Sequence, residues 1–136
     1  GEEIRKLGHE FGATTGRERR CGWIDIPALK YAIMINGVTE LSMMKADVLD
    51  SFKEIYVCTH YVQQGEQIDY FPFELNENTK PVFKKVSGWN QDITKCEKEE
   101  DFPKELSSYI EYLEKELEVP ISIVSVGPNR TETIIR

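Results

Sequence analysis

The sequence has few residues of the kinds that bind metals, and none of them at the spacing of a metal site. Its three cysteines, Cys21, Cys58 and Cys96, lie far apart, and no CxxC pair occurs. The two histidines, His9 and His60, have no second histidine, cysteine or cluster of carboxylates beside them. We therefore expect no metal site in this chain. An odd number of widely spaced cysteines favours free thiols in a reducing, cytoplasmic setting.

Long apolar runs and an excess of positive charge are also absent. No run approaches the roughly 20 apolar residues of a membrane-spanning helix, and we expect neither a membrane span nor a signal peptide. The 24 acidic and 17 basic residues give a formal charge of −7, which argues against nucleic acids and anionic membranes as partners. The pattern G-x-x-x-x-G-K-[ST] does not occur, so we expect no phosphate-binding loop of that type.

The residues that are present suit one globular domain. The chain has 136 residues, of which 40% are hydrophobic and 30% charged, and this is enough to bury a core. It begins at Gly1 without a methionine, and its last residues have the pattern of a strand that simply stops. We expect it to be a piece of a longer protein.

Two segments are predicted to be helices. Asp25 is a good helix cap and Pro27 suits the first turn. Gly37 is typical of the position after a helix end, so the first helix is predicted at Ile26–Asn36. The second is predicted at Phe102–Val119 from apolar residues at helical spacing. These residues are Leu106, Tyr109, Ile110, Leu113 and Leu117.

Six short segments, mostly rich in β-branched or aromatic residues, are predicted to be strands. The first of them also fits a helical turn, because periodicity does not separate the two over four residues. The second and third are expected to form a β-hairpin. The predicted strands are Leu41–Met44, Ile55–Val62, Gln67–Phe71, Pro81–Val86, Ile121–Val126 and Thr131–Ile135.

Lys45 and Asp47 directly follow the first of these strands and are candidate ligand-binding residues. In open α/β sheets, ligands bind in crevices at strand ends. The stem of a lysine can lie along a planar ring, and a carboxylate accepts paired N–H groups such as those of guanine. A lysine and an aspartate at this spacing also occur in ordinary solvated turns, which is the alternative interpretation.

The segment Gly12–Arg20, GATTGRERR, is an arginine cluster in an acidic chain. Its glycines let backbone N–H groups approach a ligand, and its threonines and arginines can hold a carboxylate or a phosphate. The alternative is a flexible basic loop. The turn at Ser125–Arg130 likewise either places backbone groups against a ligand or is an ordinary turn.

Four segments, in this order and at close to family spacing, resemble the C-terminal part of adenylosuccinate synthetases. The similarity runs across essentially all 136 residues, so it is far more specific than any single motif. The segments are EFGATTGRERRCGWIDIPAL, MKADVLD, VSGW and ISIVSVGPNRTETII.

The resemblance implies a fold and an activity. Residues 1–136 would be the C-terminal fragment of a large α/β domain with a mixed, mostly parallel sheet, flanking helices and a β-hairpin. The family joins IMP and L-aspartate to make adenylosuccinate in AMP biosynthesis, using GTP and Mg²⁺. Its members are cytoplasmic and usually homodimers.

The resemblance also implies a substrate loop. Arg17 matches an arginine that reaches the ribose of IMP, and Arg19 matches one near the nucleotide phosphates. The residues that match the aspartate-binding loop are Ala13, Thr14, Thr15, Gly16, Arg17, Glu18 and Arg19.

A guanine pocket is implied by two further matches, at Lys45–Asp47 and at Ser125–Gly127. Met44 departs from the family, which usually has threonine there; this removes a hydroxyl and leaves the lysine and aspartate intact. The implied GTP-binding residues are Arg19, Lys45, Ala46, Asp47, Ser125, Val126 and Gly127.

The family's catalytic groups match no position of this chain. Its glycine-rich phosphate loop, catalytic aspartate, catalytic histidine and magnesium ligands lie in the N-terminal half, so we expect the chain to be inactive alone. Two alternatives remain. One is a stand-alone ligand-binding or interaction module without catalysis. The other is a different GTP-using protein, which the GATTGR loop argues against because regulatory GTPases have no aspartate substrate.

Overall fold

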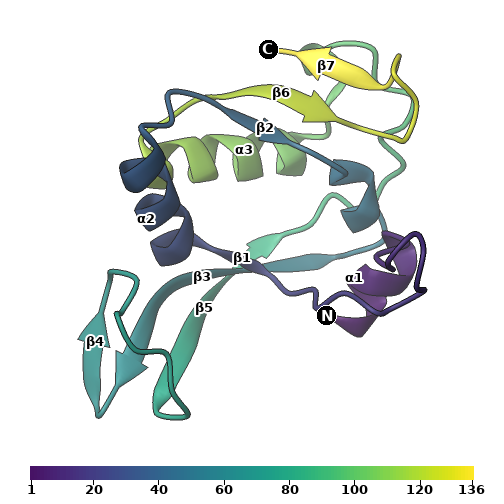
Figure 1. The fold of residues 1–136 in the computed structure, drawn as a ribbon. Helices are drawn as coiled ribbons and strands as arrows, with labels where there is room; N and C mark the ends of the chain where they lie inside the picture. The colour runs from purple at the N-terminus through teal and green to yellow at the C-terminus, as the bar shows by residue number, and fades with distance from the viewer.

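The structure is a computed structural model that describes all of residues 1–136. Two small sheets lie one above the other, and α2 carries the chain from the lower sheet to the upper one (Figure 1). No helix has the length and the apolar character needed to cross a bilayer. The α-helices are α1 (Glu2–Leu7), α2 (Ile26–Asn36) and α3 (Lys104–Leu117).

The upper sheet has the strand order β2-β6-β7. Its strands are β2 (Leu41–Met43), β6 (Ile121–Ser125) and β7 (Thr133–Ile135). β2 runs parallel to β6, with Met43 opposite Val124, and β7 runs antiparallel to β6. Parallel strands end at the same edge of a sheet, so the segments that follow β2 and β6 leave it side by side.

The lower sheet is built on β3 (Glu54–Gln63), which pairs with every other strand of that sheet. β1 (Ile24–Asp25) is parallel to it, whereas β4 (Glu66–Ile68) and β5 (Thr79–Ser87) are antiparallel. The mixture of parallel and antiparallel strands with helices confirms the α/β class predicted from the sequence.

The predicted elements are found, with differences in length, and α1 and β1 are additions. α2 has the predicted bounds, and α3 lies inside its predicted range. The return arm of the hairpin is shorter than the predicted Gln67–Phe71, because the chain leaves β3 after Ile68 and the ring of Phe71 stacks on Tyr31 of α2, 5.6 Å between centroids. α1 was not predicted, since four of its six residues, Glu2, Glu3, Arg5 and Lys6, are charged.

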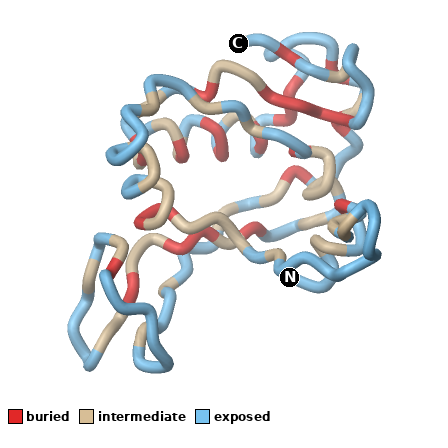
Figure 2. Tube along the Cα trace, in the orientation of Figure 1, coloured by how far each residue is buried: buried red, intermediate tan, exposed pale blue.

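One hydrophobic core joins α3 to strands of both sheets. Buried residues line the inner side of α3, most of β6 and parts of β3 (Figure 2). Ile55 and Val57 of β3 and Val124 of β6 are fully buried. The residues of α3 predicted to form its apolar stripe are all buried: Leu106, Tyr109, Ile110, Leu113 and Leu117.

Candidate functional site

The candidate site lies at the edge of the upper sheet where β2 and β6 end. After β2 the chain makes a 3₁₀ turn at Ala46–Leu49, which packs against β6. After β6 it enters the turn that begins at Val126 and Gly127, both of them buried. The parallel pairing therefore brings together the two segments that the sequence analysis assigned to guanine, although about 80 residues separate them in the chain.

Lys45 holds a left-handed backbone conformation, with φ of 61°, at the start of the 3₁₀ turn. Non-glycine residues rarely adopt this conformation, and it is typical of functional sites. The Lys45 ammonium donates hydrogen bonds to the carbonyl oxygen of Gly8 and to Oε1 of Glu10. The position of this side chain is thus set by contacts with a segment more than 30 residues away.

Asp47 has a buried acceptor without a donor. Its Oδ1 is buried and makes no hydrogen bond within the chain. A buried polar atom left unsatisfied costs roughly 1–3 kcal/mol, and such atoms in native structures call for an explanation. A ligand that presents an N–H group to Asp47 would satisfy this atom.

The turn after β6 is closely packed. Ser125 donates its hydroxyl hydrogen to the carbonyl oxygen of Gly127, 2.9 Å away, and the Val126 N–H donates to the carbonyl of Glu132. A Cβ on Gly127 would lie 2.4 Å from Oε2 of Glu132. Glycine therefore lets the Glu132 carboxylate sit against the turn. The hydroxyl of Ser125 is used inside the turn, so backbone groups rather than this side chain are left to meet a ligand.

The loop Gly12–Arg19 is a tight, exposed hairpin. An isolated bridge joins Phe11 to Glu18, and the Gly12 N–H donates to the carbonyl oxygen of Arg17, 2.8 Å away. Gly16 has a φ of 64°, which favours glycine. The residues from 13 to 20 are all exposed. The guanidinium of Arg17 makes no hydrogen bond or ion pair, so it is free to bind an anion.

Ion pairs link this loop to α1 and to the 3₁₀ turn. Glu10 Oε2 accepts from Arg19, at 2.8 Å, while its Oε1 accepts from Lys45. Arg5 of α1 donates to Glu18 at 2.8 Å and to the carbonyl oxygen of Arg19 at 2.7 Å. The hydrogen bond from Lys45, followed by that from Arg19, lowers the pKa of Glu10, so its carboxylate is ionised at neutral pH.

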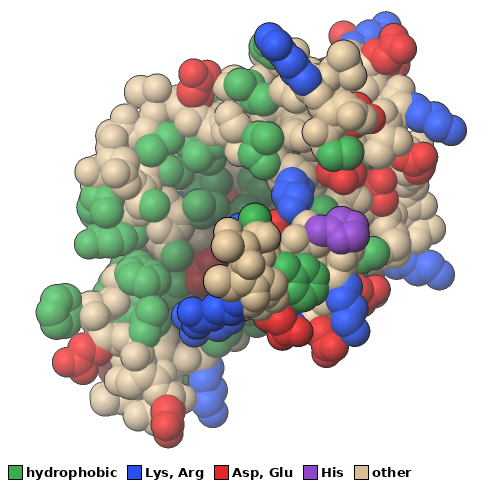
Figure 3. Space-filling view, turned by 45° about the vertical axis from the view of Figure 1, so that its right-hand side comes forward, with side chains coloured by type: hydrophobic (Ala, Val, Ile, Leu, Met, Phe, Trp, Pro, Cys, Tyr) green, Lys and Arg blue, Asp and Glu red, His purple; other side chains and the backbone are tan.

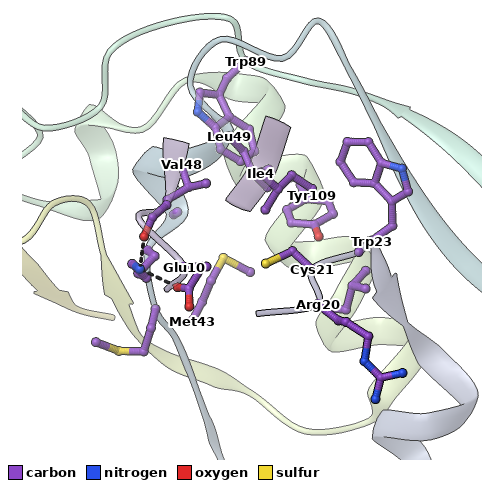
Figure 4. A pocket seen from close by; sticks show the side chains of 16 residues that line it. Ile4, Glu10, Arg20, Cys21, Trp23, Met43, Val48, Leu49, Trp89 and Tyr109 are labelled. Carbon is purple, nitrogen blue, oxygen red and sulfur yellow. Dashed lines mark hydrogen bonds and ion pairs between the residues drawn. The ribbon is translucent and has the colours of Figure 1, made fainter. Parts of the chain in front are cut away.

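A cavity of about 510 Å³ lies between α1, the segment before β1 and the 3₁₀ turn. Glu10 and Lys45 line it, whereas Arg17, Asp47 and the turn at Ser125–Gly127 do not. Glu10, Cys21 and Met43 point toward its interior, and the dashed lines mark the bonds of the lysine ammonium (Figure 4). Most of the lining is apolar, with Trp23, Leu49 and further hydrophobic side chains forming the walls. Apolar walls with a few polar groups are typical of small-molecule sites.

Charge is unevenly spread over the face that carries the site. Hydrophobic side chains gather on the left of Figure 3, whereas lysines, arginines and acidic residues crowd the right. No group of three or more histidine, cysteine, aspartate or glutamate residues is placed to hold a metal ion.

The structure brings together most of the residues singled out from the sequence. Lys45 and Asp47 lie in the segment after β2, whose 3₁₀ turn contacts β6, and Glu10 joins Lys45 to Arg19. Glu10 itself was missed by the sequence analysis. The available signal was an acidic residue directly before an arginine-rich loop, but its partner Lys45 is 35 residues away.

Comparisons with known proteins agree with the sequence and the fold. The family model of adenylosuccinate synthetase matches residues 1–134. The chain is 57% identical over 136 residues to adenylosuccinate synthetase of Phocaeicola vulgatus and 54% identical to that of Bacteroides fragilis. It covers 32% of each, so it spans about a third of the length of these curated relatives.

A solved structure is similar along the whole chain. It is described as fully ligated adenylosuccinate synthetase from Plasmodium falciparum, with a TM-score of 0.94 and 38% sequence identity. The match covers 100% of this chain and 34% of that one. The chain belongs to the adenylosuccinate synthetase family.

Proposed function

We propose that this chain supplies one side of the active site of a GTP-dependent ligase that joins IMP and L-aspartate to form adenylosuccinate. In this account residues 1–136 are the C-terminal fragment of one α/β domain and carry the guanine pocket and the aspartate loop. The full-length protein works in the cytoplasm as a homodimer. The observation that carries the proposal is the buried, unpaired Oδ1 of Asp47, next to Lys45 at the shared edge of β2 and β6.

The guanine pocket follows from the chemistry of Asp47. A carboxylate has only acceptors, and guanine presents two adjacent N–H groups on its ring edge that adenine lacks. Placing guanine here would satisfy the buried Oδ1, while the stem of Lys45 covers a face of the ring. The turn at Ser125–Gly127 closes the other side of the pocket with backbone groups. This accounts for GTP rather than ATP as the nucleotide.

The aspartate loop follows from the free guanidinium of Arg17. A planar guanidinium binds a carboxylate with two parallel hydrogen bonds. Thr14 and Thr15 and the exposed N–H groups of the hairpin supply further donors for the second carboxylate. Arg17 also reaches the ribose of IMP, and Arg19 lies on the side of the GTP phosphates.

The chemical steps belong to residues outside this chain. We assign no Mg²⁺ ligand to this chain, and the sequence has no G-x-x-x-x-G-K-[ST] pattern of a phosphate-binding loop. The relatives are about three times as long, which leaves room for those groups elsewhere in the protein. This chain binds and orients GTP, IMP and aspartate, and has no part in proton or phosphoryl transfer.

Replacing Asp47 by Asn in the full-length protein tests the proposal. The substitution puts an N–H₂ group where an acceptor is needed. Losing a bidentate partner of a base edge costs on the order of 1–3 kcal/mol, so the KM for GTP should rise about 5- to 150-fold while the KM for aspartate changes little. Steady-state kinetics with GTP and with ATP measure this. Unchanged kinetics with both nucleotides would identify Asp47 as an ordinary turn residue.

A further inference from the structure

Glu10 occupies a junction that the proposed function leaves without a role. One oxygen of its carboxylate accepts from Lys45, and the other accepts from Arg19 at 2.8 Å. Lys45 belongs to the proposed guanine pocket. Arg19 belongs to the proposed aspartate loop and is also assigned to the side of the GTP phosphates. No other carboxylate in the chain makes hydrogen bonds with residues of both groups.

The backbone of Glu10 is fixed as well. Its N–H donates to the carbonyl oxygen of Arg5 in α1, and its own carbonyl oxygen accepts from the N–H of Arg19, 3.0 Å away. Glu10 thus stands at the base of the Gly12–Arg19 hairpin, where it meets α1. Movement of this residue would move the hairpin, because the Arg19 backbone and side chain are both attached to it.

Exposure differs sharply between the carboxylate and its partners. The Glu10 side chain is 22% exposed, compared with 60% for Arg19 and 51% for Lys45. The two cations can reach a ligand, whereas the carboxylate that holds them is largely covered and also lines the cavity. Glu10 therefore acts on a ligand through the cations and not by direct contact.

We propose that Glu10 is a positioning residue that couples guanine-nucleotide binding to aspartate binding. This rests on the proposed function of Lys45 and of the Gly12–Arg19 loop. A nucleotide that fixes Lys45 also fixes the Glu10 carboxylate, and Glu10 fixes Arg19 and the base of the hairpin. The second ligand then meets a loop that is already ordered and binds more tightly, and the coupling is reciprocal.

The test compares the affinity for GDP with and without L-aspartate in the full-length protein. Calorimetry without IMP measures binding in the absence of turnover. In the unmodified protein, saturating aspartate should tighten GDP binding about fivefold or more, which is the usual lower range of allosteric coupling. Glu10→Gln should bring this ratio close to one, because the amide replaces one of the two acceptor oxygens by an N–H₂ donor that faces a cation. Glu10→Asp, which keeps the charge, should retain part of the coupling.

A matched control is Glu54→Gln in the lower sheet. Glu54 also accepts from two partners, Lys85 at 2.8 Å and the hydroxyl of Tyr56 at 3.1 Å, and neither belongs to the site. This variant should keep the coupling ratio of the unmodified protein. A merely structural role of Glu10 would lower stability in a thermal melt without changing the ratio.

The outcomes separate this proposal from the proposed function. Equal ratios in Glu10→Gln and the unmodified protein, or no coupling in the unmodified protein, overturn the role of Glu10. If Asp47→Asn nevertheless raises the KM for GTP, the result supports the proposed guanine pocket even though Glu10 has no coupling role. If Glu10→Gln does not fold, the coupling ratio of Glu10→Asp decides the question. A ratio below that of the unmodified protein supports the role of Glu10, and an unchanged ratio overturns it.

Discussion

At the scale of single residues, the cations of the site differ in whether they have a partner. Arg5, Arg19 and Lys45 are each held by a glutamate, whereas the guanidinium of Arg17 has no partner in the chain. Among the acidic residues, Asp47 likewise lacks a partner, because its buried Oδ1 accepts no hydrogen bond. Arg17 and Asp47 therefore lack partners among the residues assigned to ligand contact, whereas Lys45 and Arg19 are held by Glu10.

Replacing Arg17 by Leu in the full-length protein should weaken the use of aspartate much more than the use of GTP. Loss of a charged partner that is bound directly costs on the order of 2–5 kcal/mol, so kcat/KM for aspartate should fall about 30-fold or more. Steady-state kinetics with each substrate varied in turn measure the effect. Equal losses for GTP, IMP and aspartate would indicate a folding defect and contradict a specific role in carboxylate binding.

Contacts between residues that are far apart in the sequence could not be predicted from the sequence. Lys45 and Asp47 could be predicted as candidate ligand-binding residues, because they follow a strand directly and their side-chain types suit a planar ligand with N–H groups. The contact of Lys45 with Glu10 was not, since it depends on how α1 and the hairpin fold back on the 3₁₀ turn. Met44, which differs from the usual threonine, is 61% exposed, and its exposure explains why the substitution leaves the neighbouring turn intact.

At the scale of elements, local signals predicted most of the fold. Asp25 accepts from the N–H of Ala28 at 3.0 Å and Gly37 has a φ of 60°, so the cap and the end of α2 are where the sequence placed them. α1 and β1 could not be predicted in this way. α1 has six residues and no side-chain cap, and isolated helices of this length are unstable. Its Arg5 is tied to the substrate hairpin, so tertiary contacts hold it in place.

The junction between β5 and β3 depends on Gly88. A Cβ at this position would lie 2.1 Å from the carbonyl oxygen of Phe52, which is backbone and cannot move aside cheaply. Gly88→Ala should therefore lower the free energy of unfolding by about 1–3 kcal/mol, the usual cost of overpacking, as measured by urea denaturation. Gly22→Ala is the control, because a Cβ there meets nothing within 4 Å. Similar losses in the two variants would contradict the steric argument.

At the scale of the whole molecule, the chain folds around one core, and we propose that it holds only one side of a site. The core joins α3 to strands of both sheets and includes Ala46 and Val126, one residue from each of the two turns proposed to bind guanine. The order of the motifs along the chain was enough to predict the family and the fold class. The arrangement of the site was not predictable from order alone, because it requires the parallel pairing of β2 with β6.

The central claim is that this chain carries the binding side of the site and not the chemistry. The most direct measurement mixes the purified chain, residues 1–136, with IMP, GTP, Mg²⁺ and L-aspartate, assays for adenylosuccinate, and measures GTP binding by calorimetry. The account predicts no adenylosuccinate and GTP affinity far weaker than micromolar, because the phosphate-binding groups lie outside the chain. Turnover, or micromolar affinity for GTP, would contradict it by revealing a complete nucleotide site within these 136 residues.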